Sequence, residues 1–325
     1  MANRTEKRKM ASTKWIAQQI PSQTGKTALI TGANSGIGYQ AALELARHGA
    51  HVLLGVRSLA KGQAALERLL QEAPGASAEV AELDIASLTS IHDFSRKFIA
   101  SGRVLDLLIN NAGVMALPTR ELTPDGFERQ FGTNHLGHFA LTGLLLPQFR
   151  GAPTPRVITV ASLAHRTGKI EFDNLQSERS YVPWDTYNNS KLANILFARE
   201  LDRRARAAGS RLASIPVHPG ISKTSIVDNG PGMGSKDLKV RVLKVVAPLI
   251  MQDDVMGALP TLYAATAPEA KGGEYIGPDG FMEFKGYPKV VQARPQALDE
   301  AVGKKLWQVS EELTGVTYQI GRAHV

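Results

Sequence analysis

The chain has 325 residues, of which 43% are hydrophobic and 21% are charged, a composition that excludes a disordered or fibrous protein. Its length is sufficient for a sizeable hydrophobic core, in one large α/β unit or in two smaller domains. The chain contains no cysteine, which excludes disulfides, thiolate nucleophiles and cysteine-based zinc or iron–sulfur centres. Any chemistry must therefore come from oxygen, nitrogen or a bound cofactor.

The formal net charge of +8 raises the question of a nucleic-acid partner. Residues 1–14 carry five Lys or Arg and a single Glu, so half of the excess charge lies in this N-terminal tail. No groove pattern of aromatic and basic residues follows, and we therefore expect a solvated tail and no nucleic-acid binding. No apolar run approaches the ~20 residues that span a bilayer, and no signal-peptide segment is present. We expect a cytoplasmic protein without a transmembrane segment.

From Lys26 onwards, short apolar runs alternate with longer segments of helical periodicity, the pattern of βαβ units that build a parallel sheet. Several runs lack polar alternation, as expected when helices cover both faces of a sheet. The predicted strands are Thr27 to Ile30, His51 to Val56, Ala78 to Leu83, Leu105 to Ile109, Arg156 to Val160, Leu212 to Val217 and, as a seventh, Glu274 to Ile276. The predicted fold class is α/β, a Rossmann-type doubly wound parallel sheet of about seven strands.

No internal repeat or Pro/Gly/Ser-rich linker divides the chain, so we predict one domain over residues 14–318, after a flexible basic tail over 1–13. Residues 319–325 are interpreted as a non-native or disordered tail, because a common sequencing-adapter read encodes the last six of them. The segment 221–256 combines glycines with a basic amphipathic run. It is either a surface loop and helix or a lid over a substrate pocket, and its place after the sixth strand favours the lid.

A glycine-rich turn, Thr31-Gly-Ala-Asn-Ser-Gly-Ile-Gly38, directly follows the first strand and opens the first helix. Its glycines permit a tight turn, a close approach of a pyrophosphate and close helix–strand packing. The exposed N–H groups and the helix dipole favour an anion there. We therefore predict a dinucleotide site with contacts from Gly32, Asn34, Ser35, Gly36, Ile37 and Gly38.

The end of the second strand indicates which dinucleotide binds. An NAD site would place a carboxylate about 20 residues beyond the glycine turn, to accept a hydrogen bond from the ribose 2′-hydroxyl. Here Val56, Arg57 and Ser58 stand instead. Val56 has no acceptor, whereas the guanidinium of Arg57 can pair with a 2′-phosphate. We predict NADP(H), with Arg57 and Ser58 as contacts; the alternative is that Arg57 is only a solvated residue at a helix start.

Three further motifs follow in order: Asn110-Asn-Ala-Gly113, Ser162, and Tyr187-Asn-Asn-Ser-Lys191. Together with the glycine turn they closely resemble the short-chain dehydrogenase/reductase family, from Lys26 to about Gly280. The resemblance implies an oxidoreductase that moves a hydride between the nicotinamide and a carbonyl or alcohol carbon. It implies a catalytic set of Asn134, Ser162, Tyr187 and Lys191, and further cofactor contacts from Asp84, Ile85, Asn111, Ala112, Gly113, Tyr187, Lys191, Pro219, Gly220, Ile221 and Thr224.

The residues around these motifs resemble the retinol-dehydrogenase-like branch of that family. This branch also includes relatives that act on other hydrophobic carbonyl compounds. The resemblance lies in Leu54-Gly-Val-Arg57, in residues 133–139 and in Ser162-Leu-Ala-His-Arg166. The branch shares the 25-residue separation of Ser162 and Tyr187. The resemblance implies a small hydrophobic substrate, which is an aldehyde, a ketone or a retinol-like alcohol. This chain lacks the hydrophobic N-terminal segment of membrane-anchored members, which argues against a retinoid. Dimers and tetramers are common in the family, which implies a homodimer or homotetramer.

Tyr187 and Lys191 are four residues apart, so a helix places both on one face. A phenol with a pKa near 10 is a poor base at neutral pH, and a neighbouring ammonium and a positively charged nicotinamide would stabilise its phenolate. By the resemblance, Ser162 hydrogen-bonds the substrate oxygen and Asn134 holds a water relay behind Lys191.

Other readings of these residues remain. His135 and His138 have no third ligand nearby, which favours a packing or surface role, and we predict no metal. Tyr181 and Trp184 either wall the substrate pocket or pack in the core. A protochlorophyllide-reductase-like enzyme is disfavoured by the missing cysteine. A catalytically idle NADP-binding regulator is disfavoured because the serine, tyrosine and lysine are all present.

Overall fold

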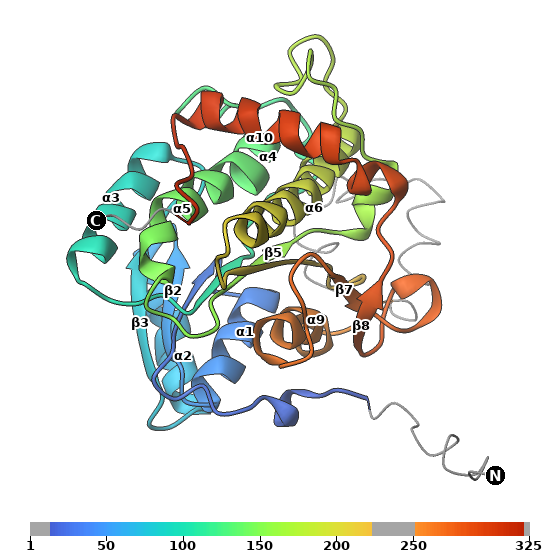
Figure 1. The fold of residues 1–325 in the computed structure, drawn as a ribbon. Coiled ribbons are helices and arrows are strands. Elements are labelled where there is room, and N and C mark those ends of the chain that lie inside the picture. The colour runs from blue at the N-terminus through green and yellow to red at the C-terminus, as the bar shows by residue number, and fades with distance from the viewer. Residues whose placement is uncertain (1–13, 223–250, 322–325) are drawn as a thin grey trace, which may run out of the picture.

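Eight strands form one sheet in the computed structural model, which describes residues 14–222 and 251–321 (Figure 1). The strand order is β3-β2-β1-β4-β5-β6-β7-β8; β1 to β7 are parallel and β8 is antiparallel to β7. The strands are β1 (Thr27–Thr31), β2 (His51–Val56), β3 (Ser77–Glu82), β4 (Leu107–Asn110), β5 (Arg156–Val160), β6 (Ala213–Val217), β7 (Tyr275–Pro278) and β8 (Pro288–Val291).

Helices cover both faces of this sheet because its strands are apolar on both sides. One core cluster joins the sheet to α1 (Gly36–Arg47), α2 (Leu59–Glu72) and α9 (Asp254–Thr266). On the other face lie α3 (Leu88–Ala100), α4 (Arg129–Phe131), α5 (Gly137–Leu145) and α6 (Pro183–Ala207), and α10 (Glu300–Thr314) packs on α6. Short 3-10 or π turns occupy Ala17–Gln19, Gly132–Leu136, Leu146–Phe149, Leu163–Thr167, Phe281–Glu283 and Pro295–Leu298.

The predicted fold class is confirmed, and each predicted strand is present with ends that differ by no more than two residues. The eighth strand was not predicted. β8 has only four residues, starts at Pro288 and exposes Lys289 and Val290, so it carries neither a buried apolar run nor a clear alternation. A proline is tolerated there because β8 is an edge strand.

The strand order reverses beside β1, whose neighbours β2 and β4 are reached by connections running in opposite directions across the sheet. In open α/β sheets ligands bind outside the carboxyl ends of the strands at such a point. The glycine turn at the end of β1 and Asn110-Asn-Ala-Gly113 at the end of β4 both lie there. The fold therefore places the predicted motifs around one crevice.

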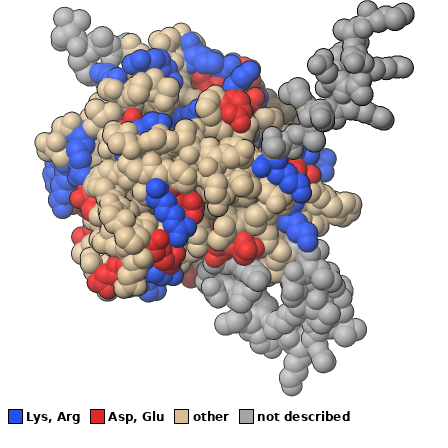
Figure 2. All heavy atoms as spheres, turned by 90° about the horizontal axis from the view of Figure 1, so that it is seen from below, with Lys and Arg blue, Asp and Glu red and all other residues tan. Residues whose placement is uncertain are grey.

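The segments outside this unit are described only in part. Most of the predicted lid, residues 223–250, lies outside the described residues, as do 1–13 and 322–325. Ile320, in the predicted tail, packs against the core cluster beneath α3 and α5. Within 14–222 and 251–321, no helix is long and apolar enough to cross a membrane. Figure 2 shows one face, on which basic and acidic side chains of the described part are interspersed.

Candidate active site

A cleft of about 710 Å³ opens at the carboxyl ends of the central strands. Its walls come from the glycine turn, the end of β2, the loops after β3, β4, β5 and β6, and the first turns of α6. The sequence-predicted residues that line it are Gly32, Asn34, Ser35, Gly36, Ile37, Gly38, Arg57, Ser58, Asp84, Ile85, Asn111, Ala112, Gly113, Ser162, Tyr187, Lys191, Pro219, Gly220 and Ile221. Asn134 lies behind this lining, and Thr224 falls outside the described residues.

The glycine turn leaves room for a dinucleotide. Gly32 and Gly36 have φ angles of 68° and 59°, a left-handed backbone that glycine adopts without strain. A Cβ on Gly38 would lie 2.5 Å from both the Nδ2 atom of Asn111 and the carbonyl oxygen of Gly32. Glycine at position 38 therefore lets α1 pack closely on the turn, and the N-terminus of α1 lines the cleft, which fits a bound pyrophosphate.

Hydrogen bonds of Thr31 connect the glycine turn to the loop after β4. Its Oγ1 atom accepts the backbone N–H groups of Asn111 and Ala112, each at 2.9 Å. The side-chain amide of Asn111 donates to the carbonyl oxygen of Thr31 at 2.9 Å. Sequence reasoning did not assign Thr31 a role, although it is the first residue of the motif. Two segments about 80 residues apart in the chain are thus held as one wall.

The end of β2 presents basic side chains to the cleft. Arg57 and Lys61 both line it, and the hydroxyl of Ser58 accepts the N–H of Lys61 at 3.4 Å, which caps α2. Sequence reasoning missed Lys61, whose signal was its position one helical turn beyond Arg57. Val56 is only 2% exposed and packs near Gly62, so its side chain points into the core and away from the cleft.

Ser162, Tyr187 and Lys191 meet deeper in the cleft. Tyr187 and Lys191 lie in the first half of α6, and both are at least nine-tenths buried. The Tyr187 hydroxyl faces the Ser162 side chain, whose influence opposes the rise in the phenol pKa, and the Ser162 hydroxyl accepts the N–H of Ala164 at 3.1 Å. The Nζ atom of Lys191 donates to the carbonyl oxygen of Val160 at 3.2 Å and lies 5.7 Å from the centre of the Tyr187 ring. The fold thus brings three predicted residues together from two elements.

Asn134 supports this group from a π turn, Gly132–Leu136, between α4 and α5. Such local widening of a helix is frequent at functional sites. The Asn134 amide donates to the carbonyl oxygen of Val114 and to the hydroxyl of Ser190, both at 2.9 Å. Its Oδ1 atom accepts the N–H of Val114 at 2.8 Å. The side chain is fully buried, so Asn134 fixes the loop after β4 and the start of α6.

Burial governs the acid–base properties of the pair on α6. It raises the pKa of Tyr187 to about 12, with the Ser162 hydrogen bond opposing the shift, and it lowers the pKa of Lys191 to about 8. In the chain by itself, burial outweighs the lowering of the phenol pKa that a neighbouring ammonium would give, and that ammonium donates to Val160. At neutral pH the phenol is protonated and can donate a proton.

The family model described as short chain dehydrogenase matches residues 26–231, the part of the chain that carries the glycine turn, Ser162, Tyr187 and Lys191. The chain belongs to the short-chain dehydrogenase/reductase family. It is 41% identical to retinol dehydrogenase 14 of Homo sapiens, over 90% of this chain and 87% of that protein. It is 39% identical to retinol dehydrogenase 13 of Homo sapiens, over 90% of this chain and 85% of that protein.

A solved structure of an uncharacterized protein from Mycobacterium paratuberculosis is 40% identical, with a TM-score of 0.76, and covers 94% of this chain and 99% of that one. The resemblance to a retinol-dehydrogenase-like branch of the family is thereby confirmed, since relatives of that name match over most of the chain. Membership establishes a nicotinamide-dependent oxidoreductase fold.

The two histidines near Asn134 are core residues of this short-chain dehydrogenase/reductase. His135 is 1% exposed and its Nε2 atom lies 2.9 Å from the hydroxyl of Ser310. His138 is equally buried and pairs with Thr31 at 2.9 Å, so it supports the glycine turn. Within the described part of the chain no group of three His, Asp or Glu is placed to hold a metal ion.

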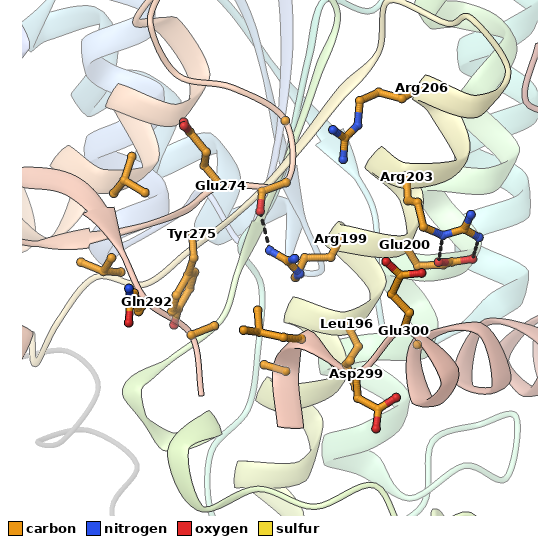
Figure 3. A pocket seen from close by; sticks show the side chains of 18 residues that line it. Leu196, Arg199, Glu200, Arg203, Arg206, Glu274, Tyr275, Gln292, Asp299 and Glu300 are labelled. Atoms are coloured by element: carbon orange, nitrogen blue, oxygen red, sulfur yellow. Dashed lines mark hydrogen bonds and ion pairs between the residues drawn. The ribbon is translucent and has the colours of Figure 1, made fainter. Parts of the chain in front are cut away.

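A second cavity of about 530 Å³ lies between α6, β7, β8 and the start of α10 (Figure 3). Its charged side chains are largely paired with one another or with backbone. Arg199 donates to the carbonyl oxygen of Gly273, and Arg203 makes two hydrogen bonds with Glu200, each at 2.7 Å. None of the predicted site residues lines this cavity, so the candidate active site is the cleft over β1 and β4.

Proposed function

We propose that this chain is an NADP(H)-dependent oxidoreductase that interconverts a carbonyl and an alcohol on a small hydrophobic substrate. The observation that carries this proposal is the meeting of Ser162, Tyr187 and Lys191 in the cleft that also contains the glycine turn. When bound, the nicotinamide would supply or accept the hydride. The residues of the chain would orient the substrate and move the proton on its oxygen.

Tyr187 is the proton donor in carbonyl reduction and the acceptor in the reverse direction. Its pKa of about 12 keeps the phenol protonated, which is the form that reduction requires. Ser162 lines the cleft beside that phenol, so its hydroxyl would direct the substrate oxygen to the same place. Alcohol oxidation would need the phenolate, which the burial of Tyr187 disfavours and a positively charged oxidised nicotinamide would favour.

Lys191 would hold the nicotinamide ribose and add positive charge beneath the reacting oxygen. Its Nζ atom uses one donor on Val160 and keeps two others for ligands. Asn134 acts through its hydrogen bonds with Val114 and Ser190, which fix the loop after β4 relative to α6. A water relay behind Lys191 remains a part of the proposal.

Arg57 and Lys61 support the choice of NADP(H) over NAD(H). Both line the cleft beside the end of β2, where a 2′-phosphate would lie, and a guanidinium pairs with phosphate through two parallel hydrogen bonds. The Ser58 hydroxyl caps α2 and holds the first turn that carries Lys61. No acidic side chain of β2 lines the cleft within the described residues.

Apolar side chains beside Tyr187 in the cleft support a hydrophobic substrate. Val114, Met115, Leu163 and Trp184 line it next to Tyr187, and the Trp184 ring meets the Tyr187 ring edge-on at 6.1 Å. The names of the similar retinol dehydrogenases agree with an apolar alcohol or aldehyde. Tyr181 instead donates to the carbonyl oxygen of Leu117 at 2.6 Å and braces the loop after β4.

The experiment that tests the proposal follows NADPH absorbance of the purified chain against a panel of apolar aldehydes, ketones and quinones, with NADH in parallel. We expect turnover of at least one aldehyde or ketone with NADPH preferred, and loss of that turnover in the Tyr187→Phe variant. Tight NADPH binding without turnover of any member would favour a non-catalytic NADP-binding protein instead.

A further inference from the structure

A buried polar cluster lies directly behind Ser162 and is not used by the proposed chemistry. It contains His165, His218, Tyr275 and the carboxylate of Glu283, which come from four separate segments. His218 is fully buried and Glu283 is 21% exposed. The cluster connects the turn after β5, the loop after β6 and the loop between β7 and β8.

On one side the cluster holds the backbone of Ser162. The Nδ1 atom of His165 lies 2.7 Å from the Ser162 carbonyl oxygen, and because a carbonyl only accepts, Nδ1 carries the hydrogen. The Tyr275 hydroxyl donates to the same oxygen at 3.5 Å. Figure 3 shows Tyr275 where it also lines the second cavity. Arg166 follows His165 directly in the turn Leu163–Thr167, and it extends the cluster towards Glu283.

On the other side the cluster holds Pro219, Gly220 and Ile221. The Nε2 atom of His218 lies 3.1 Å from the Oε2 atom of Glu283, and because a carboxylate only accepts, Nε2 carries the hydrogen. The Nδ1 atom of the same ring accepts the N–H of Gly220 at 3.2 Å, as only a neutral imidazole can, and burial lowers the pKa of His218 in agreement with this state. The carboxylate thus fixes the tautomer that holds this loop.

Glu283 is the point where the two sides meet. The same Oε2 atom that contacts His218 lies 2.9 Å from Nη2 of Arg166, with which it forms an ion pair. Burial opposes ionisation, but the contacts with His218 and Arg166 and the charge of Arg166 hold the pKa of Glu283 below its usual range. Met282 and Glu283 have φ angles of 51° and 62°, a left-handed backbone that is unfavourable for both residues. Such strain persists where surrounding contacts impose it, and it is found at functional sites.

We propose that Glu283 is a positioning residue that fixes the Ser162 turn relative to the Pro219-Gly220-Ile221 segment through Arg166 and His218. The inference rests on the proposed function, in which Ser162 touches the substrate oxygen and that segment contacts the nicotinamide. The reacting carbon atoms of substrate and cofactor are held by these two segments. A misplacement of about 1 Å between reacting groups can cost about a hundredfold in rate.

The test compares Glu283→Gln with wild type and with the control Asp279→Asn. Gln keeps the size of Glu283 and one carbonyl oxygen, but it removes the negative charge that pairs with Arg166. Asp279 lies in the same loop, where its Oδ1 atom accepts the N–H of Tyr287, and Asn can keep that contact while removing one charge. Each variant is measured for kcat and KM, for the isotope effect with 4-deuterated NADPH, for the emission of bound NADPH and for its urea midpoint.

We expect Glu283→Gln to lower kcat about tenfold to a hundredfold and to raise the isotope effect, with a cofactor Kd within about threefold of wild type and weaker emission of the bound nicotinamide. Arg166→Gln should behave in the same way, and the double variant should be little worse than either single one, because both break one link. Asp279→Asn should match wild type.

Two results would overturn the proposal: a kcat of Glu283→Gln within about twofold of Asp279→Asn, or a loss of rate that only follows the unfolded fraction. If Glu283→Gln does not fold, the kinetics of Arg166→Gln test the proposal instead. That substitution removes the same Arg166–Glu283 ion pair, and it does so at a partly exposed side chain. Binding of a reduced nicotinamide follows from family membership alone. Unchanged emission of that bound cofactor therefore refutes the positioning role even if no carbonyl substrate is found.

Discussion

The side chain of Asn134 and the backbone of Val114 hold each other through two hydrogen bonds: the Asn134 amide donates to the Val114 carbonyl oxygen at 2.9 Å, and its Oδ1 atom accepts the Val114 N–H at 2.8 Å. An amide side chain is the group that can satisfy both backbone atoms at once. The pair joins the π turn to the loop that lines the cofactor cleft, so the shape of the cleft depends on it.

Asn134→Ala should therefore lower the free energy of unfolding by about 1–3 kcal/mol, because it leaves buried partners on Val114 and Ser190 without hydrogen bonds. It should also raise the Kd for NADPH, because the loop after β4 loses its support. Urea denaturation and cofactor titration measure the two effects. Asn189→Ala, which removes one exposed hydrogen bond to Lys169, is the control and should change both values little. Equal effects of the two substitutions would contradict this role.

Gly113→Ala should damage the site through a steric clash. A Cβ at this position would lie 2.9 Å from Oδ1 of Asn134 and 3.4 Å from Nζ of Lys191, and Oδ1 cannot move without losing the Val114 N–H. We expect about 1–3 kcal/mol of lost stability and a fall in kcat. Gly303→Ala in α10 is the control: its Cβ would approach no atom closer than 3.9 Å, so stability should stay or rise. Thermal unfolding of both variants gives the comparison.

Tyr187→Phe should abolish turnover while NADPH binding persists, because the ring still packs and only the exchangeable proton is removed. Positioned acid–base catalysis is worth roughly 10² to 10⁴-fold, so less than about a hundredth of the wild-type kcat should remain. Steady-state rates and fluorescence titration of NADPH measure the two quantities. A variant that retains more activity than this would show that another group supplies the proton.

Arg57→Ala and Lys61→Ala should each weaken NADPH binding and leave NADH binding nearly unchanged. A charge-assisted contact with the 2′-phosphate contributes ~1.5 to 3 kcal/mol, which is about tenfold to a hundredfold in Kd. Titrations at low ionic strength, where the attraction is least screened, give the largest difference. Wild-type protein that binds NADH as tightly as NADPH would refute the assignment. A substitution at Val56 is unsuitable, since its side chain is buried in the core.

The buried Lys191 predicts a pH dependence of stability. Its pKa is lowered from 10.5 to about 8 by burial, so between these values the unfolded chain binds a proton that the native chain does not. Stability contributed at this position therefore rises with pH above about 8. From pH 8 to pH 9.5, wild type should gain about 2 kcal/mol relative to Lys191→Met, whose side chain does not titrate. Urea denaturation of both proteins at each pH measures the difference, and a constant difference would exclude a lowered pKa.

The sequence determined the elements and the motif residues, because both depend on local patterns. Apolar runs separated by helical periodicity predicted seven strands, and the spacing of glycines after the first of them predicted the turn at the start of α1. The four-residue spacing of Tyr187 and Lys191 placed both on one helix face for the same reason. Such features are set by residues that are near one another in the chain.

Only the tertiary structure decided what depends on contacts between distant segments. It directed Val56 into the core and Lys61 into the cleft, turned the Lys191 ammonium towards Val160, and raised the pKa of Tyr187 through burial. It also joined Arg166, His218 and Glu283, which are up to 117 residues apart in the chain, at one carboxylate oxygen. Burial and hydrogen-bond geometry arise only when the elements pack, so no local pattern of residues encodes them.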